Sequence, residues 1–239
     1  MAGSLQYSVV RDHLRDKLNH RERMLGFVRM ARYVLIQGPW RSWIVRWYQR
    51  RNANPPLPVR DRSIFDPIDV DEAVRRLDRD AFATGLDVPE PTVDEIVAYA
   101  RAAGTKRINE PHLHCEAVRR IAHDPIVAEV ASRYLGLAPI LCTSKLYWTI
   151  PPARDPAGMM RAAAEGGRFH YDVADLKALT VFVYLTDVDR ESGPHIAIRG
   201  SQRRSALANF RRFIDDDYAE RVYGDRIEVI TGPRGTCWF

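Results

Sequence analysis

The chain has 239 residues and a mass of 27.4 kDa, with 46% hydrophobic and 28% charged residues, as in an ordinary soluble globular protein. It contains no apolar run long enough to span a bilayer, and its N-terminus lacks the apolar core of a signal peptide. Its three cysteines are too few and too scattered for a disulfide framework. We therefore expect a cytoplasmic protein with reduced thiols.

The net charge of +5 is unevenly distributed along the chain. Residues 1–60 hold twelve Arg or Lys and three acidic residues, a net charge of +9, whereas residues 61–239 hold 24 basic and 28 acidic residues, a net charge of −4. The proline-rich run 52–58 excludes helix and reads as a linker. We predict a basic helical segment over 1–60 and a separate domain over 61–239.

Two helices are predicted in the basic segment. Apolar residues at helical spacing indicate one over 6–36, and a second is expected over 40–50, where three tryptophans lie on one side among arginines: Trp40, Trp43 and Trp47. This pattern fits a helix packed on its own domain with solvated arginines, which is the favoured interpretation. It also fits an interfacial membrane helix. Binding to nucleic acid is the least favoured of the three interpretations, because no binding motif is present and the basic residues do not continue into the acidic remainder of the chain.

Three helices are predicted next, followed by strands. Asp69 with Glu72, and Thr92 with Glu95, resemble capping boxes, and Asp124-Pro125 predicts a third helix that ends at Gly136. From residue 138 onward, β-branched and aromatic runs predict strands at 141–150, 178–187, 195–199, 225–230 and 235–239, with a loop over 153–167 and a helix over 205–222.

Two groups of residues carry candidate metal chemistry. His112, His114 and Cys115 have no second ligand pair at finger-like spacing, so a structural or surface role is favoured over zinc. His170 and Asp172 are different, because alternate residues of an extended strand share a face and an imidazole and a carboxylate can then converge on one cation. A facial iron triad also needs a second imidazole and open positions for oxygen and a cosubstrate.

The run FHYDVADLKALTVFVYLTDVDRESGPHIAIRGSQ resembles the metal-binding core of the phytanoyl-CoA dioxygenase family. The matching elements are H-x-D, a hydrophobic strand ending in L-T-D-V, an acidic turn with S-G-P, and a short strand ending in G-S. With the preceding helices and the GPRGTCWF ending, the resemblance covers about residue 63 onward. It implies an α+β fold with a mainly β core, a double-stranded β-helix (jelly roll, cupin-like) with flanking N-terminal helices.

The resemblance implies an iron(II)- and 2-oxoglutarate-dependent oxygenase acting with dioxygen on a small-molecule substrate. His170 and Asp172 match the first two iron ligands. Relatives contact the cosubstrate at positions that correspond to Tyr184, Lys145 and Tyr147. Two of these residues also have a simpler interpretation: Tyr184 as an ordinary core residue and Lys145 as an ordinary surface residue. Relatives that halogenate lack the carboxylate found here at Asp172, so hydroxylation is the expected reaction.

The sequence departs from the family pattern near its end. The distal histidine and the arginine that pairs with the cosubstrate follow a strand like 235–239 in relatives, where this sequence stops, so the domain is expected to be C-terminally incomplete. Gly200-Ser201-Gln202 replaces the usual G-S-H, and Arg199 replaces a proline. We do not expect His195 to replace the distal histidine, because relatives with the same G-P-H turn keep their distal histidine. Arg199 in place of the arginine that pairs with the cosubstrate is a disfavoured alternative.

Two hypotheses follow for the function. One is a hydroxylase that acts on a small organic or lipid-like substrate. The other is a non-catalytic binding protein on the same scaffold, membrane-associated through Trp40, Trp43 and Trp47.

Overall fold

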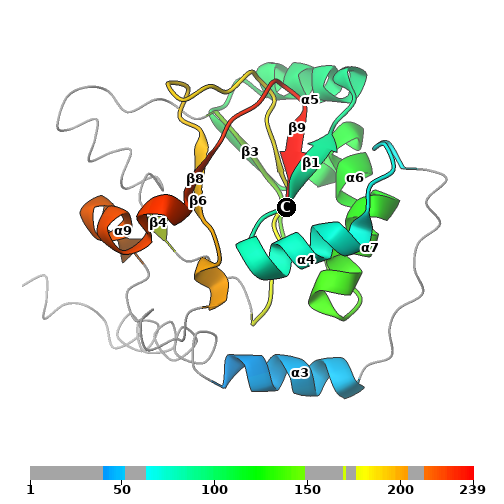
Figure 1. Ribbon diagram of the computed structural model, residues 1–239. Coiled ribbons are helices and arrows are strands. Elements are labelled where there is room, and N and C mark those ends of the chain that lie inside the picture. The colour runs from blue at the N-terminus through cyan, green and yellow to red at the C-terminus, as the bar shows by residue number, and fades with distance from the viewer. Residues whose placement is uncertain (1–39, 52–62, 149–168, 171–175, 204–212) are drawn as a thin grey trace, which may run out of the picture.

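Helices and short antiparallel strands alternate along the chain in the computed structural model (Figure 1). The structure describes residues 40–51, 63–148, 169–170, 176–203 and 213–239. The helices are α3 (Arg41–Arg51), α4 (Val70–Asp80), α5 (Glu90–Ala103), α6 (Glu116–Ala122), α7 (Pro125–Leu135) and α9 (Asp216–Tyr223). The strands are β1 (Thr84–Asp87), β2 (Arg107–Asn109), β3 (Lys145–Tyr147), β4 (Phe169–His170), β5 (Phe182–Val183), β6 (His195–Ile198), β7 (Phe213–Ile214), β8 (Ile227–Ile230) and β9 (Thr236–Trp238). Short 3-10 turns lie at Pro111–Leu113, Ser201–Arg203 and Gly224–Arg226.

Local capping signals set the ends of α4 and α7. The Asp69 carboxylate accepts a hydrogen bond from the Glu72 amide at 3.0 Å, and Asp124 accepts one from the Ile126 amide at 2.8 Å. At the C-terminus of α7, Gly136 has φ +70°, the left-handed conformation that glycine adopts without strain. The predictions made from Asp69 and from Asp124-Pro125 are therefore confirmed.

The predicted start of α5 is wrong by one turn. The helix begins at Glu90, and Thr92 is a buried residue inside it. Pro91 explains the difference, because a proline in the first turn lacks an N–H that would have no partner there in any case. Thr92 is not needed as a cap, and its backbone N–H donates to the Pro89 carbonyl.

The sheets are small and antiparallel. β9 lies in the middle of a three-stranded sheet with the order β1-β9-β5, and the other pairs are β2 with β3, β4 with β7, and β6 with β8. Between β1 and β9 the pairing extends beyond the strands, since Ala83 and Phe239 exchange two backbone hydrogen bonds. The described part of the chain is thus mixed helix and strand, as expected for an α+β protein.

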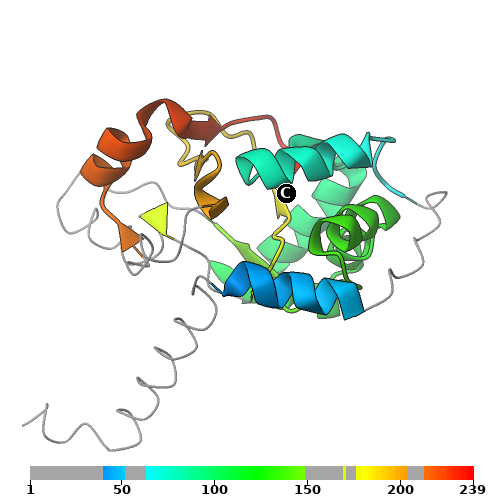
Figure 2. The ribbon, with the colours of Figure 1, turned by 60° about the horizontal axis from the view of Figure 1, so that its bottom comes forward.

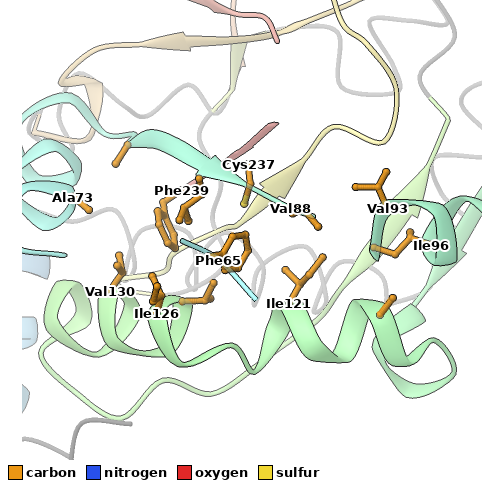
Figure 3. Close-up of a cluster of buried hydrophobic side chains, with 14 of the residues drawn as sticks. Phe65, Ala73, Val88, Val93, Ile96, Ile121, Ile126, Val130, Cys237 and Phe239 are labelled. Atoms are coloured by element: carbon orange, nitrogen blue, oxygen red, sulfur yellow. The ribbon is translucent and has the colours of Figure 1, made fainter. Parts of the chain in front are cut away.

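Buried apolar residues form two clusters. The larger joins α4, α5, α6 and α7 to β1, β3 and β9, and Figure 3 shows Phe65, Cys237 and Phe239 among side chains from the helices, such as Ile126 and Val130. The smaller cluster is built on Ile198, Ala219 and Tyr223, with Phe169 packed against it. In Figure 1 these two regions lie on opposite sides, with α4, α6 and α7 to the right and β4, β6, β8 and α9 to the left.

Several predicted strands and one predicted helix are shorter than expected. In the described residues 141–148 of the first predicted run, strand is formed only at Lys145–Tyr147, and the run 178–187 forms strand only at Phe182–Val183. The helix predicted over 205–222 is wrong at Phe213–Ile214, which pairs with β4, and α9 begins at Asp216. The strand predicted from 225 begins at Ile227, whereas the helix over 40–50 and the strand from His195 are confirmed. The predicted helix over 6–36, the linker 52–58, the boundary near residue 60 and the loop 153–167 lie outside the described residues.

Candidate functional site

His170 is the last residue of β4. It pairs with Phe213 of β7 and its side chain is exposed, whereas the preceding Phe169 packs against the smaller cluster. The alternation predicted for an extended strand therefore directs His170 away from the core. Asp172, the second predicted iron ligand, lies outside the described residues.

Tyr184, one residue beyond β5, links the two sides of the molecule. Its hydroxyl donates a hydrogen bond to the Ile230 carbonyl at 2.7 Å and accepts one from the His195 amide at 2.9 Å. Because His195 and Ile230 face each other across β6 and β8, the hydroxyl closes the end of that strand pair. Its backbone meanwhile bonds to Gly235 and Thr236 next to β9. The phenol proton thus has an acceptor within the protein.

Four rings gather around this contact, and we call them the ring cluster: Phe182, Tyr184, His195 and Trp238. Phe182 stacks on Trp238 with centroids 5.3 Å apart, and Tyr184 meets Trp238 edge-on at 4.5 Å. His195 lies 4.7 Å from Phe182 and is exposed, whereas Trp238 is buried. Burial raises the pKa of Tyr184, and the hydrogen bond from the His195 amide opposes that rise to a lesser degree.

Lys145 and Tyr147 share one face of β3. Both are exposed and flank the buried Leu146, so the side chains of this strand alternate between an exposed face and a buried face. A smaller electrostatic contribution from Tyr147 also raises the pKa of Tyr184, after the larger effect of burial.

Lys145 faces an acidic neighbour. Hydrogen bonds from the Thr143 hydroxyl and the Ser144 amide lower the pKa of Glu110, and the positive charge of Lys145 contributes further in the same direction. The Lys145 ammonium thus already has a carboxylate in its surroundings.

The His112, His114 and Cys115 group has structural contacts. His112 Nδ1 lies 2.6 Å from the Ser144 hydroxyl and 3.4 Å from a Glu110 oxygen, and Cys115 is buried where α6 begins. His114 is exposed. In the parts of the chain that the structure describes, no three His, Cys, Asp or Glu side chains are grouped closely enough to hold a metal ion.

Arg199 and His195 have other contacts in the structure. Arg199 lies 3.1 Å from a Glu228 carboxylate oxygen and donates to the Asp225 carbonyl. His195 stacks in the ring cluster. This clustering could not be predicted from the sequence, because a strand pattern shows that the side chains of Phe182, His195 and Trp238 alternate with their neighbours but not that their strands meet.

No family model, no curated protein and no solved structure matches the chain. None of the helices within the described ranges is long and apolar enough to cross a membrane.

Proposed function

We propose that the protein is an iron(II)- and 2-oxoglutarate-dependent dioxygenase that hydroxylates a small organic or lipid-like substrate on a double-stranded β-helix scaffold. The observation that carries the proposal is His170, an exposed imidazole at the end of a short antiparallel strand and the first residue of H-x-D. An exposed histidine on a strand anchored through its neighbour can present a ring nitrogen to a ligand without disturbing the core.

The two donors named are of the kinds that iron(II) takes. His170 would supply an imidazole nitrogen and Asp172 a carboxylate oxygen, two of the three donors in a site of two imidazoles and one carboxylate, which with open positions suits non-haem iron(II). When bound, the metal supplies the redox chemistry that couples dioxygen and 2-oxoglutarate to hydroxylation of a C–H bond. The second imidazole of such a set is not assigned to a residue of this chain.

The chain's own residues have separate roles in this proposal. His170 is neutral when it binds the metal, because only the unprotonated ring nitrogen is a ligand. Lys145 offers a positive charge, and Tyr147 a hydroxyl, to the cosubstrate carboxylates from one exposed face of β3. Tyr184 holds β5 against β6 and β8 through its two hydrogen bonds.

The proposal is tested with the full-length chain in two measurements. The first follows cobalt(II) binding by absorption and calorimetry, with cobalt(II) as a probe for iron(II), and the second follows iron-dependent decarboxylation of 2-oxoglutarate. His170→Ala should abolish both signals. His114→Ala is the matched control, because His114 is also exposed but belongs to the group with structural contacts.

Turnover that is unchanged in His170→Ala would overturn the assignment. Metal binding that depends on His170, without any decarboxylation, would instead support the non-catalytic binding protein on the same scaffold.

A further inference from the structure

Helix α3 has one face directed at the rest of the protein. Arg41, Val45 and Gln49 recur every four residues and so share a face, and all three are partly buried. Arg41 donates to the Leu176 carbonyl and Gln49 donates to the Leu135 carbonyl at the end of α7. The helix is therefore attached to the domain along this face. It lies along the outside of the molecule in both Figure 1 and Figure 2.

The opposite face of α3 presents aromatic side chains to solvent. Trp43 is 65% exposed, Trp40 41% and Trp47 40%. None of the residues of α3 is buried. Solvated tryptophans are costly in water, and an exposed apolar patch of this kind marks an interaction surface. We call Trp40, Trp43 and Trp47 the aromatic face.

The charge of α3 indicates which partner fits the aromatic face. The helix RSWIVRWYQRR contains four arginines and no acidic residue. Arg46 and Arg50 are exposed beside the aromatic face, and the Arg51 guanidinium lies 4.4 Å from the centre of the Trp47 ring. The long side chain of arginine lets its guanidinium group extend beyond neighbouring apolar side chains. Arg46 and Arg50 can therefore pair with an anionic surface while the tryptophan rings contact the same surface.

We propose that the aromatic face of α3 docks on an anionic lipid surface. Tryptophan prefers the boundary between headgroups and acyl chains, where its ring is in an apolar medium and its indole N–H stays near water. Lipid phosphates would pair with the exposed arginines, and the attached face would keep the domain on the aqueous side. This contact is peripheral and independent of the iron site, so it goes beyond the proposed oxygenase activity.

The experiment uses the full-length chain and sedimentation with vesicles of phosphatidylcholine alone or mixed with phosphatidylserine. Binding should rise with phosphatidylserine and fall with added salt. Arg46→Glu combined with Arg50→Glu should weaken binding by about fivefold or more for each arginine lost. Trp43→Ser should weaken it too, and it should remove part of the fluorescence quenching by lipids brominated on their acyl chains.

Two variants serve as matched controls. Arg101→Glu reverses an exposed arginine of α5, and Ile140→Ser removes an exposed apolar side chain far from α3 in the sequence. Both should bind vesicles like the parent protein. Circular dichroism and denaturation should be unchanged in every variant, since all the substituted side chains are exposed.

Three results would overturn the proposal. One is vesicle binding that persists in the α3 variants, which would place the lipid contact elsewhere in the chain. Another is concentration-dependent self-association that Trp43→Ser abolishes, which would make a second copy the occupant. The third is binding to single-stranded RNA in the absence of any vesicle binding.

Discussion

Tyr184 shows how one hydroxyl joins segments that are distant in sequence. It donates to Ile230 and accepts from His195, while its ring packs edge-on against Trp238. The carbonyl of Ile230 belongs to a buried residue and would have no water to replace the phenol. The side chain therefore stabilises the contact between β5 and the β6–β8 pair, whatever else it does in a ligand site.

Tyr184→Phe should lower the free energy of unfolding by about 1–2 kcal/mol, because two backbone groups lose their partner while the ring is kept. The measurement is urea denaturation at neutral pH. Tyr218→Phe is the control, since that tyrosine is exposed at the surface of α9. Equal stability of the Tyr184 variant and the parent would show that the two hydrogen bonds do not hold the strands together.

The same substitution should also change the pH dependence of stability. Burial raises the pKa of Tyr184 above its ordinary value of 10.0, so above that pH the unfolded chain loses this proton while the folded protein keeps it. The folded state then binds more protons, and its stability falls as the pH rises. The phenylalanine variant lacks this loss. The stability difference between the two proteins should therefore shrink above about pH 10.

At the scale of elements, α4 combines a favourable start with a strained end. Asp69 caps its N-terminus, but its C-cap is Ala81, which has φ +79° in the left-handed region. A side chain with a Cβ atom pays a steric penalty there that glycine avoids. The Ala81 amide still donates to the Leu77 carbonyl, so the helix end is bonded despite the strain.

Ala81→Gly should raise the free energy of unfolding by about 0.5–1 kcal/mol, because relief of the strain exceeds the added entropy of the unfolded chain. Gly104→Ala is the reciprocal variant. Gly104 ends α5 at φ +62° with open space around the position of a Cβ, so alanine there should cost about 1 kcal/mol through backbone strain alone. A change of the same sign in both variants would contradict this account.

These elements also show what the sequence could and could not predict. Capping residues such as Asp69 and Asp124 accept hydrogen bonds from amides two or three residues away. The helix starts at these caps can therefore be predicted from a few neighbouring residues of the sequence. The β4–β7 pair could not be read in this way. Residues 213–214 fit a helical period, yet they form strand because a partner at 169–170 is available.

The candidate site, too, could be predicted from the sequence only where it depends on local structure. Once a strand is predicted over 141–150, the alternation of its side chains is enough to put Lys145 and Tyr147 on one face of β3, opposite Leu146. It could not show that the Tyr184 hydroxyl ends on the Ile230 carbonyl, because that contact depends on how two sheets meet. The convergence of His170 with Asp172 stays a prediction.

In the complete fold, β9 is the central strand of the three-stranded sheet. It separates β1 from β5, and its Cys237 is fully buried in the larger cluster. Burial raises the pKa of the Cys237 thiol to about 12, so at neutral pH the unreactive thiol form dominates. Cys142, in contrast, is exposed.

Iodoacetamide should therefore modify Cys142 quickly in the folded protein, and Cys237 only when the protein unfolds. Peptide mapping by mass spectrometry across a urea series measures both rates. Cys237 labelling should follow the same midpoint as circular dichroism, because β9 cannot leave the sheet without separating β1 from β5. Cys142→Ser removes the fast reaction as a control, and modification of Cys237 at the rate of Cys142 without urea would show that β9 opens by itself.

The central position of β9 also has a consequence for synthesis on the ribosome. β1 and β5 are both translated before residues 236–238, which they share as a partner. Until then each has an unpaired edge, and the apolar side chains that Phe239 and Cys237 will cover are open to other chains. A pause in translation before residue 236 would prolong this interval, so the yield of soluble protein should depend on how quickly the codons for β9 are read.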